Sequence, residues 1–389
     1  MRLILITPGF SADRNDDCIP ALRTLVRGLA RRHQVTVLAL RYPGRARDYP
    51  LDGAQVTALG GGGALGWRRW TLLGRAWRWL RGRAASGEVD LVHGLWADEP
   101  GFLATSLERR YGVPALVSLL GGELARLPEV GYGHQLYRAP RWLVARSLRR
   151  AHLLTVGSPW LLERLAANRR PSGRHRAPAR LAPLGVDTDR FRPEGGERKP
   201  DLLAPGAPAI LSVGSLTPVK GHADLLAAFA RASAALPRAT LHLVGEGPLR
   251  AALETRATEL GVGARVRFHG PRAQELLPDL YRSADFCALA SRWESQSMVA
   301  LEAAASGRVT VGSAVGLLPE LAPQEGLAAP GDVDGLARAL ARAGAATETW
   351  VRWGERARAL AVPRYAVEET VAGFEAAYAE LSDRGRHRR

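Results

Sequence analysis

Two glutamates point most directly to chemistry through their spacing. Glu294 and Glu302 lie eight positions apart in SRWESQSMVALEAAASG, where we expect a strand to end, a polar turn to follow and a helix to begin near Met298. The first backbone N–H groups of such a helix have no partner within it and suit a phosphate, while a carboxylate at Glu302 can accept two hydrogen bonds from a ribose diol. The alternative is that Glu294 caps the turn and Glu302 is a solvated surface residue.

A lysine occupies a second segment of the same kind, VGSLTPVKGHADLLAAF at 213–229, which predicts a strand, a polar loop and a helix start. Lys220 would place a compact ammonium beside a diphosphate and stabilise the charge that develops as a nucleotide leaves. Lysine occurs only at Lys199 and Lys220, so its retention here favours a role that arginine does not reproduce. The alternative is a solvent-exposed lysine in a helix cap.

These segments require elements that position them, and the chain alternates strands with helices in both halves. Short apolar strands are expected at 3–7, 35–40, 89–94, 114–120 and 152–156, and the alternation restarts after residue 208 with AILSVG, ATLHLVG, RVRFHG, DFCALAS and RVTVGS. This pattern predicts an α/β fold with two doubly wound parallel sheets. Such sheets bind ligands at the carboxyl ends of their strands, which predicts a cleft where the two domains face one another.

A segment rich in proline, glycine and charge marks the domain boundary between about 187 and 208. We expect an N-terminal Rossmann-like domain over 1–190 and a C-terminal one over 191–365. A final helix with a basic tail, 366–389, is expected to cross back to the N-terminal domain. The length of 389 residues suits two domains.

Composition constrains the partners and the compartment. The formal charge of +16 suggests an anionic partner, although the excess of arginine with abundant alanine and glycine is typical of a coding bias. Cys18 and Cys287 show no metal-binding or redox spacing, and no apolar run reaches the roughly 20 residues that span a bilayer. The N-terminus lacks the pattern of a signal peptide. We therefore expect a cytoplasmic protein.

Six segments in the second domain together resemble the family 4 retaining glycosyltransferases with the GT-B fold, which use a Glu-x7-Glu motif and a Gly-x-Leu…Lys-Gly loop at the donor site. They are PLGVDTDRF at 183–191, VGSLTPVKG, LVGEGPLR at 243–250, the Glu294 to Glu302 motif, GLLPELAP at 316–323 and GLAAPGD at 326–332. The resemblance implies that Lys220 contacts the diphosphate, Glu302 the ribose and Glu294 the donor-sugar hydroxyls. It also implies that the strand end near His269 and Gly270 lies against the base.

The predicted site divides into three groups. Lys220 and Glu294 are the predicted catalytic residues. The predicted donor-binding residues are Ser215, Gly270, Ser295, Gln296, Ser297, Met298 and Glu302, and the predicted acceptor-side residues are Gly9, Phe10, His93, Gly121, Gly122 and Glu123. No metal ligand and no cofactor other than the nucleotide diphosphate-sugar is predicted, because no Asp-x-Asp cluster lies beside the phosphate loop.

This sequence departs from the family pattern at three positions. Ser215 stands where such proteins often carry an arginine, and Leu120 where they often carry a histidine. Ser297 replaces a common glycine, which matters if the position needs positive φ. These departures leave room for an altered donor or acceptor.

The predicted acceptor-side residues lie near strand ends of the first domain. Gly9 and Phe10 follow the first strand, where a simple turn is the alternative, and His93 either lines the cleft or is a satisfied structural group. Glu123 follows Gly121 and Gly122 and is a polar candidate without an assigned role.

The stretch 67–83, WRRWTLLGRAWRWLRGR, places four tryptophans among six arginines. A helix would bring Trp67, Trp70, Leu73, Trp77 and Leu80 to one side, which suits a membrane interface. The alternative is a helix packed on its own domain with an arginine-rich exterior. No nucleic-acid-binding module is found, so nucleic acid is not a predicted partner.

The predicted function is retaining transfer of a sugar from a UDP- or GDP-linked donor to an acceptor glycan, lipid-linked glycan or small molecule. The family's usual setting is polysaccharide or glycolipid biosynthesis for the cell envelope, with peripheral membrane contact. Two alternatives are a GT-B phosphorylase or sugar-nucleotide epimerase and a non-catalytic GT-B homologue acting as a scaffold. The lack of a visible pyridoxal-phosphate lysine motif disfavours a phosphorylase, and the presence of Lys220, Glu294 and Glu302 disfavours the scaffold.

Overall fold

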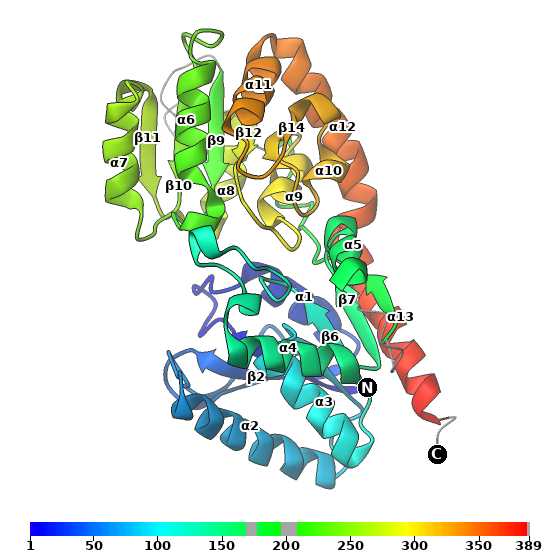
Figure 1. Cartoon of the computed structure of the whole chain (residues 1–389). Helices are drawn as coiled ribbons and strands as arrows, with labels where there is room; N and C mark the ends of the chain where they lie inside the picture. Colours follow the sequence, from blue (N-terminus) through cyan, green and yellow to red (C-terminus); the bar gives the residue numbers. More distant parts are fainter. Residues whose placement is uncertain (169–176, 196–207, 387–389) are drawn as a thin grey trace. The chain divides into compact units, whose positions relative to one another are not determined.

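The computed structural model describes residues 1–168, 177–195 and 208–386, and the chain divides into two compact units (Figure 1). Unit 1 comprises Met1–Pro128, Gly133–Gly185 and Val367–Arg389, and unit 2 comprises Glu129–Tyr132 and Val186–Ala366. Residues 196–207 of the predicted linker, which include Lys199, and the last three residues of the basic tail lie outside the described residues.

Unit 1 contains an eight-stranded sheet in the order β3-β4-β2-β1-β5-β6-β7-β8. Its strands are β1 (Arg2–Gly9), β2 (Gln34–Tyr42), β3 (Arg47–Leu51), β4 (Ala54–Ala58), β5 (Leu91–Leu95), β6 (Ala115–Leu119), β7 (Leu153–Val156) and β8 (Ala179–Leu181). Neighbouring strands pair in parallel except β3 and β4. The five strands expected from apolar runs correspond to β1, β2, β5, β6 and β7, which confirms the predicted fold class for this unit.

The β3–β4 hairpin is an element that the sequence analysis missed. Asp52 and Gly53 join the two strands at φ values of 51° and 81°. Two central residues with positive φ are the requirement of a type I′ turn, for which Asp-Gly is a favoured sequence. The hairpin adds an antiparallel edge to an otherwise parallel sheet.

Six α-helices and the 3₁₀ turn η2 are described in unit 1, and the 3₁₀ turn η1 begins in unit 1 at Pro128 and continues into the unit 2 segment Glu129–Tyr132. The helices are α1 (Pro20–Ala30), α2 (Trp67–Ala85), α3 (Glu99–Tyr111), α4 (Arg138–Arg150), α5 (Pro159–Asn168) and α13 (Val367–Arg386), and the turns are η1 (Pro128–Val130) and η2 (His134–Leu136). Helix α1 begins at a proline, whose fixed φ suits a first turn. Helix α13, red in Figure 1, packs on α1 and β6.

Helix α2 packs on its own unit, as in the second alternative for the stretch 67–83. Leu72, Leu73, Ala76 and Leu80 are buried in the core of unit 1. The predicted stripe from Trp67 to Leu80 is therefore divided, because Leu73 and Leu80 pack inward whereas Trp67 and Trp70 are exposed. Contact of this helix with a membrane stays a prediction. Within the described ranges, no helix combines the length and the apolar character needed to cross a bilayer.

Unit 2 contains a six-stranded, all-parallel sheet in the order β11-β10-β9-β12-β13-β14. Its strands are β9 (Ala209–Val213), β10 (Thr240–Val244), β11 (Val266–Gly270), β12 (Phe286–Leu289), β13 (Thr310–Ser313) and β14 (Leu327–Ala328). The order in the chain reverses between β9 and β12, as in a Rossmann fold. The doubly wound second sheet is thereby confirmed.

Helices and 3₁₀ turns connect these strands. They are η4 (Pro218–Lys220), α6 (His222–Ala232), α7 (Arg250–Glu259), η5 (Gly263–Arg265), η6 (Gln274–Leu276), α8 (Leu277–Ser283), α9 (Met298–Ala305), α10 (Leu318–Leu321), η7 (Gln324–Gly326), α11 (Val333–Gly344) and α12 (Thr347–Tyr365). The chain enters unit 2 at Val186 and leaves it at Ala366, and these residues form an isolated parallel bridge. The two ends of unit 2 therefore lie side by side.

Candidate functional site

The site in unit 2 lies where the strand order reverses. Strand β9 has β10 on one side and β12 on the other, so the segments that follow β9 and β12 leave the sheet next to each other. Ligands of open parallel sheets bind at this point, beyond the carboxyl ends of the strands. Lys220 follows β9 and Glu294 follows β12, which places both predicted catalytic residues there.

Lys220 and Glu294 form an ion pair. The Lys220 ammonium donates to Glu294 Oε1 at 2.6 Å, and the Ser291 hydroxyl donates to the same oxygen at 2.7 Å. Their side chains are only 28% and 12% exposed, so the pair is partly shielded from water. Glu294 therefore balances the charge of the Lys220 ammonium.

Glycines allow the two loops to approach this closely. A Cβ at Gly221, the residue after the lysine, would lie 2.1 Å from the carbonyl oxygen of Ala290. A Cβ at Gly316 would lie 2.5 Å from the carbonyl oxygen of Gln296, in the loop that carries Glu294. Both glycines have positive φ, at 66° and 60°, so a side chain would be both strained and crowded.

The start of α9 is formed by Ser297, which adopts φ 78°. Residue 297 therefore has the positive φ that glycine adopts without strain, so the serine that replaces the common glycine is strained here. The side chain is 5% exposed, and its hydroxyl has no hydrogen-bond partner among the described residues. The first backbone N–H groups of α9 also have no partner within the helix, so the helix start offers several donors to an anion.

Glu302 is buried on α9, so the alternative of a solvated surface residue is excluded. The Tyr281 hydroxyl donates to its Oε2 at 2.9 Å, and the Gln274 amide donates to its Oε1 at 3.3 Å. Burial raises the pKa of Glu302 to about 7, although both hydrogen bonds and Arg190 act to lower it. The carboxylate is thus oriented but close to its protonation midpoint at neutral pH.

Five further predicted donor-binding residues belong to unit 2. Ser215 is exposed, with its hydroxyl 3.3 Å from that of Thr217, and Gly270 ends β11 at φ 69°. Gln296 is buried and its amide contacts the sulfur of Met298 at 3.3 Å. Ser295 is half-buried in the same turn.

The predicted base-contacting end of β11 contains paired histidines. His269 stacks on His242 with ring centroids 5.2 Å apart and ring nitrogens 3.0 Å apart. Burial, then the neighbouring His269 and Arg267, lower the pKa of His242 to about 4. Neutral rings are therefore expected here at physiological pH.

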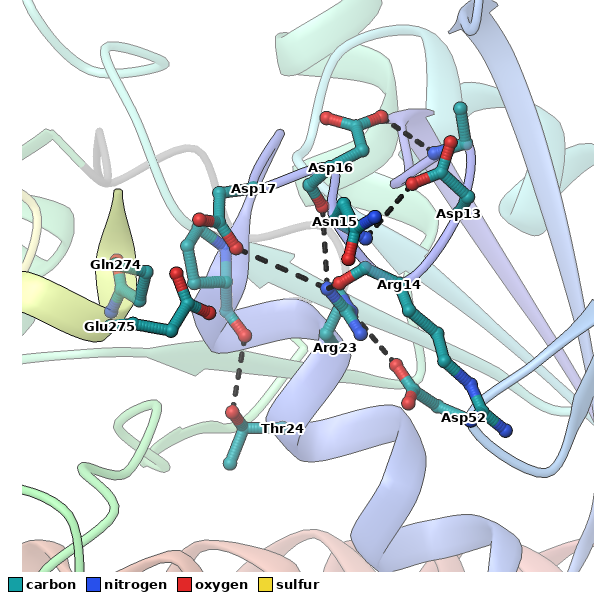
Figure 2. Close-up of polar contacts among 12 residues, drawn as sticks. Asp13, Arg14, Asn15, Asp16, Asp17, Arg23, Thr24, Asp52, Gln274 and Glu275 are labelled. Carbon is teal, nitrogen blue, oxygen red and sulfur yellow. Dashed lines mark hydrogen bonds and ion pairs between the residues drawn. The ribbon is translucent and has the colours of Figure 1, made fainter. Parts of the chain in front are cut away.

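In unit 1, Arg23 is one of two arginines that donate to the loop that follows β1, and the other is Arg47 (Figure 2 shows Arg23). Arg23 donates to the carbonyl oxygen of Arg14 at 2.9 Å and to Asp52 Oδ2 at 2.9 Å. Gly9 is buried against Tyr42, and Phe10 is 1% exposed. Phe10 therefore points into the interior of unit 1, which favours a packing role over contact with an acceptor.

His93 is also an interior residue. Its two ring nitrogens lie 2.9 Å from the hydroxyl of Tyr378 on α13 and 2.7 Å from the hydroxyl of Ser118 on β6. Burial lowers the pKa of His93 to about 3, so the ring is neutral. This geometry favours the structural alternative for His93, as a tie between the sheet and the C-terminal helix.

Glu123 hydrogen-bonds to the backbone of the loops that follow β5 and β6. Its carboxylate accepts hydrogen bonds from the backbone N–H groups of Leu120 at 3.0 Å, Gly121 at 2.7 Å and Ala97 at 3.3 Å. Burial raises its pKa. The Gly122 carbonyl oxygen accepts from the His134 N–H at 2.9 Å. Glu123 thus shapes the predicted acceptor-side loop from within.

Several residues of this geometry were not predicted from the sequence. Tyr281 matches the pattern of an apolar helix face, and only its partner Glu302 reveals its polar role. Asp98 pairs with His134 at 3.1 Å; burial opposes protonation, but this pair raises the pKa of His134 to about 9. Trp96 has φ 84°, a strained value for a bulky residue. Among the described residues, no group of three or more His, Cys, Asp or Glu side chains could hold a metal ion.

Two family models match this chain. The model described as "Glycosyltransferase Family 4" matches residues 21–190, and the model described as "Glycosyl transferases group 1" matches residues 207–345. D-inositol 3-phosphate glycosyltransferase of Mycobacterium leprae is 32% identical over 270 residues, covering 62% of this chain and 56% of the relative. The chain thus spans just over half the length of that relative.

Solved structures share the fold along nearly the whole chain. Sucrose-phosphate synthase from Thermosynechococcus elongatus has a TM-score of 0.83 at 23% identity and covers 97% of this chain and 98% of its own. HepE from Anabaena in complex with UDP-glucose has a TM-score of 0.71 at 18% identity, covering 97% and 99%. These likenesses confirm the GT-B fold class.

Proposed function

The chain belongs to the family 4, or group 1, glycosyltransferases, and we propose on this premise that it transfers a sugar from a nucleotide diphosphate-sugar to an acceptor with retention of anomeric configuration. The observation that carries the proposal is the Lys220–Glu294 ion pair at the point where the strand order of unit 2 reverses. It joins two residues from separate sequence segments at the place where nucleotides bind in such sheets.

Each donor group has a matching partner in this proposal. The diphosphate replaces Glu294 as the partner of the Lys220 ammonium. It also accepts hydrogen bonds from the start of α9, where the Ser297 hydroxyl is buried and has no partner among the described residues. Glu294, released from the lysine, accepts hydrogen bonds from hydroxyls of the donor sugar. Glu302, held by Tyr281, accepts the ribose diol.

Charge development explains why this arrangement would accelerate transfer. As the bond from the sugar to the phosphate breaks, negative charge grows on the leaving diphosphate, and a preorganised ammonium and helix start stabilise it without reorganising water. The departing phosphate would help to deprotonate the acceptor on the same face of the sugar. We propose that no metal ion takes part; chelation with EDTA would leave the rate unchanged.

A UDP-sugar is the favoured donor, because HepE was solved with UDP-glucose, and a GDP-sugar is the second choice. The acceptor would be a glycan, a lipid-linked glycan or a small molecule, in cytoplasmic assembly of polysaccharide or glycolipid for the cell envelope. We infer the acceptor side from the end of β1, where Gly9 lies, and from the loop beyond β6, which contains Gly121, Gly122 and Glu123.

A non-catalytic homologue that binds nucleotide remains the second candidate. It is favoured by Ser215 and Leu120, which stand where family members often carry an arginine and a histidine. The two candidates differ in turnover and share nucleotide binding.

Release of nucleoside diphosphate from UDP-, GDP- and ADP-sugars would test the proposal, with wild type compared with Glu294→Gln. We expect slow hydrolysis of one donor by the wild type and a loss of tenfold or more in the variant. Glu325→Gln, an exposed glutamate in the same unit, is the matched control and should keep the wild-type rate. Nucleotide binding without release of product from any donor would favour the non-catalytic candidate.

A further inference from the structure

The exposed aromatic residues of unit 1 are concentrated at the starts of α2 and α4. Trp67 is 72% exposed, Trp70 is 50% exposed and Trp142 is 48% exposed. The rings of Trp70 and Trp142 are 6.3 Å apart between centroids, so the two helices present their indoles together. We call Trp67, Trp70 and Trp142 the indole face. Leu65, just before α2, adds an aliphatic side chain that is 67% exposed.

Other residues than these exposed indoles attach α2 and α4 to the core of unit 1. Helix α2 is fixed by Leu72, Leu73, Ala76 and Leu80, which are all buried. Helix α4 is fixed by Leu143 and Val144, which are also buried. The Trp142 ring also lies 5.6 Å from that of the partly buried Phe102, but 48% of the residue stays exposed. An exposed group of large apolar side chains is typical of an interaction surface.

The same two helices carry only positive charge. Helix α2 contains six arginines and α4 contains five, and neither contains an aspartate or glutamate. The exposed arginines are Arg68, Arg75, Arg78 and Arg81 on α2 and Arg138, Arg141 and Arg149 on α4. The arginines are close enough to repel one another. The pKa of Arg146 is lowered mainly by burial and further by the positive charges of Arg150, Arg109 and Arg149.

We propose that the indole face and its surrounding arginines bind the surface of a bilayer that contains anionic phospholipid. Indoles prefer the boundary between headgroups and acyl chains, and arginines pair with lipid phosphates. The exposed Leu65 beside Trp67 favours lipid over nucleic acid, because an aliphatic side chain gains from an acyl layer and has no counterpart in a sugar-phosphate backbone. The surface belongs to unit 1 alone, so the proposal does not depend on donor chemistry in unit 2.

Vesicle flotation of the full chain tests this surface. Wild type is compared on vesicles of phosphatidylcholine alone and of phosphatidylcholine with 30 mol% phosphatidylglycerol. Since each arginine near an anionic surface contributes about 1 kcal/mol, we expect at least tenfold stronger binding to the anionic vesicles and a steep loss at high salt.

Two variants and one control separate the contributions. Trp67→Ser combined with Trp70→Ser should reduce binding to anionic vesicles at least tenfold, and Arg78→Glu combined with Arg141→Glu should reduce it further. Val351→Ser, which removes an apolar side chain that is 40% exposed in unit 2, should bind like the wild type. Circular dichroism would establish that each variant is folded.

Absence of binding to anionic vesicles would overturn the proposal, as would binding that both double variants retain. Binding of a single-stranded RNA more tightly than anionic vesicles, with the same dependence on the indole face, would assign the surface to nucleic acid instead. Nucleotide-sugar turnover is measured separately, so its outcome does not affect this one.

Discussion

Glu302→Gln should make the protein more stable at alkaline pH while it removes nucleotide binding. The carboxyl group is buried, and its pKa is raised from 4.5 to about 7. The folded state therefore disfavours the charged form. Below pH 4.5 the group is protonated in both the folded and unfolded states, and it costs no stability. Between pH 4.5 and 7 the unfolded chain ionises first, so the free energy of unfolding falls as the pH rises, and above pH 7 the cost is constant.

The size of this effect follows from the shift. A rise of 7 − 4.5, or about 2.5 units, corresponds to roughly 3 kcal/mol at 1.36 kcal/mol per unit. The amide that Glu302→Gln introduces would be neutral at every pH and can still accept the hydrogen bond from Tyr281. The variant should therefore gain roughly 2 to 3 kcal/mol over the wild type between pH 5 and pH 8.5.

Urea denaturation of wild type and Glu302→Gln at half-unit steps of pH measures this difference. Glu325→Gln is the control, since this glutamate is exposed, and its difference from the wild type should not follow the same curve. A stability difference between wild type and Glu302→Gln that is independent of pH would refute the assignment of the raised pKa to Glu302.

Three other substitutions test further parts of the structure by thermal or urea denaturation. Ser297→Gly should stabilise by up to about 1 kcal/mol, because it relieves a side chain at φ 78° whose buried hydroxyl has no described partner; a loss of stability would contradict this. Asp98→Asn should lower the melting temperature most below pH 6.5, with the difference fading as the pH rises through 9, since the ion pair raises the pKa of His134 to about 9; equal destabilisation at pH 6 and pH 10 would contradict it. Tyr378→Phe should cost about 1–3 kcal/mol because it leaves the buried nitrogen of His93 without its partner at 2.9 Å, and a neutral substitution would show that the pair is unimportant.

The residues of the proposed donor site could be named from the sequence because each lies in a continuous strand, loop and helix segment. Lys220 follows β9 and Glu294 follows β12, and the Rossmann strand order makes these two loops neighbours. The relevant pattern is local, so the spacing of a few residues was enough to indicate it. Tyr281, the polar partner of Glu302, could not be predicted from the sequence. It lies on a separate helix, α8, and its spacing matches that of an ordinary core residue.

The acceptor-side residues show a different limit. Parallel strands are covered on both faces, so alternation along a strand does not indicate which side chain reaches an open edge. Phe10 and His93 both lie near strand ends, yet both are buried. The helical wheel of α2 likewise grouped Leu73 with Trp67, but a wheel does not say which face meets the sheet. The Asp52–Gly53 turn, by contrast, was a readable hairpin signal.

Calorimetric titration of UDP, GDP and ADP into wild type and Lys220→Ala is the most direct measurement of the donor site. At least one nucleotide should bind the wild type, and the lysine substitution should weaken it tenfold or more, because it removes the ammonium and leaves Glu294 facing the diphosphate. The double variant Lys220→Ala with Glu294→Gln should recover part of that loss, since it removes the unbalanced carboxylate. Binding of no nucleotide by the wild type, or equal binding by Lys220→Ala, would contradict a donor site at the Lys220–Glu294 pair.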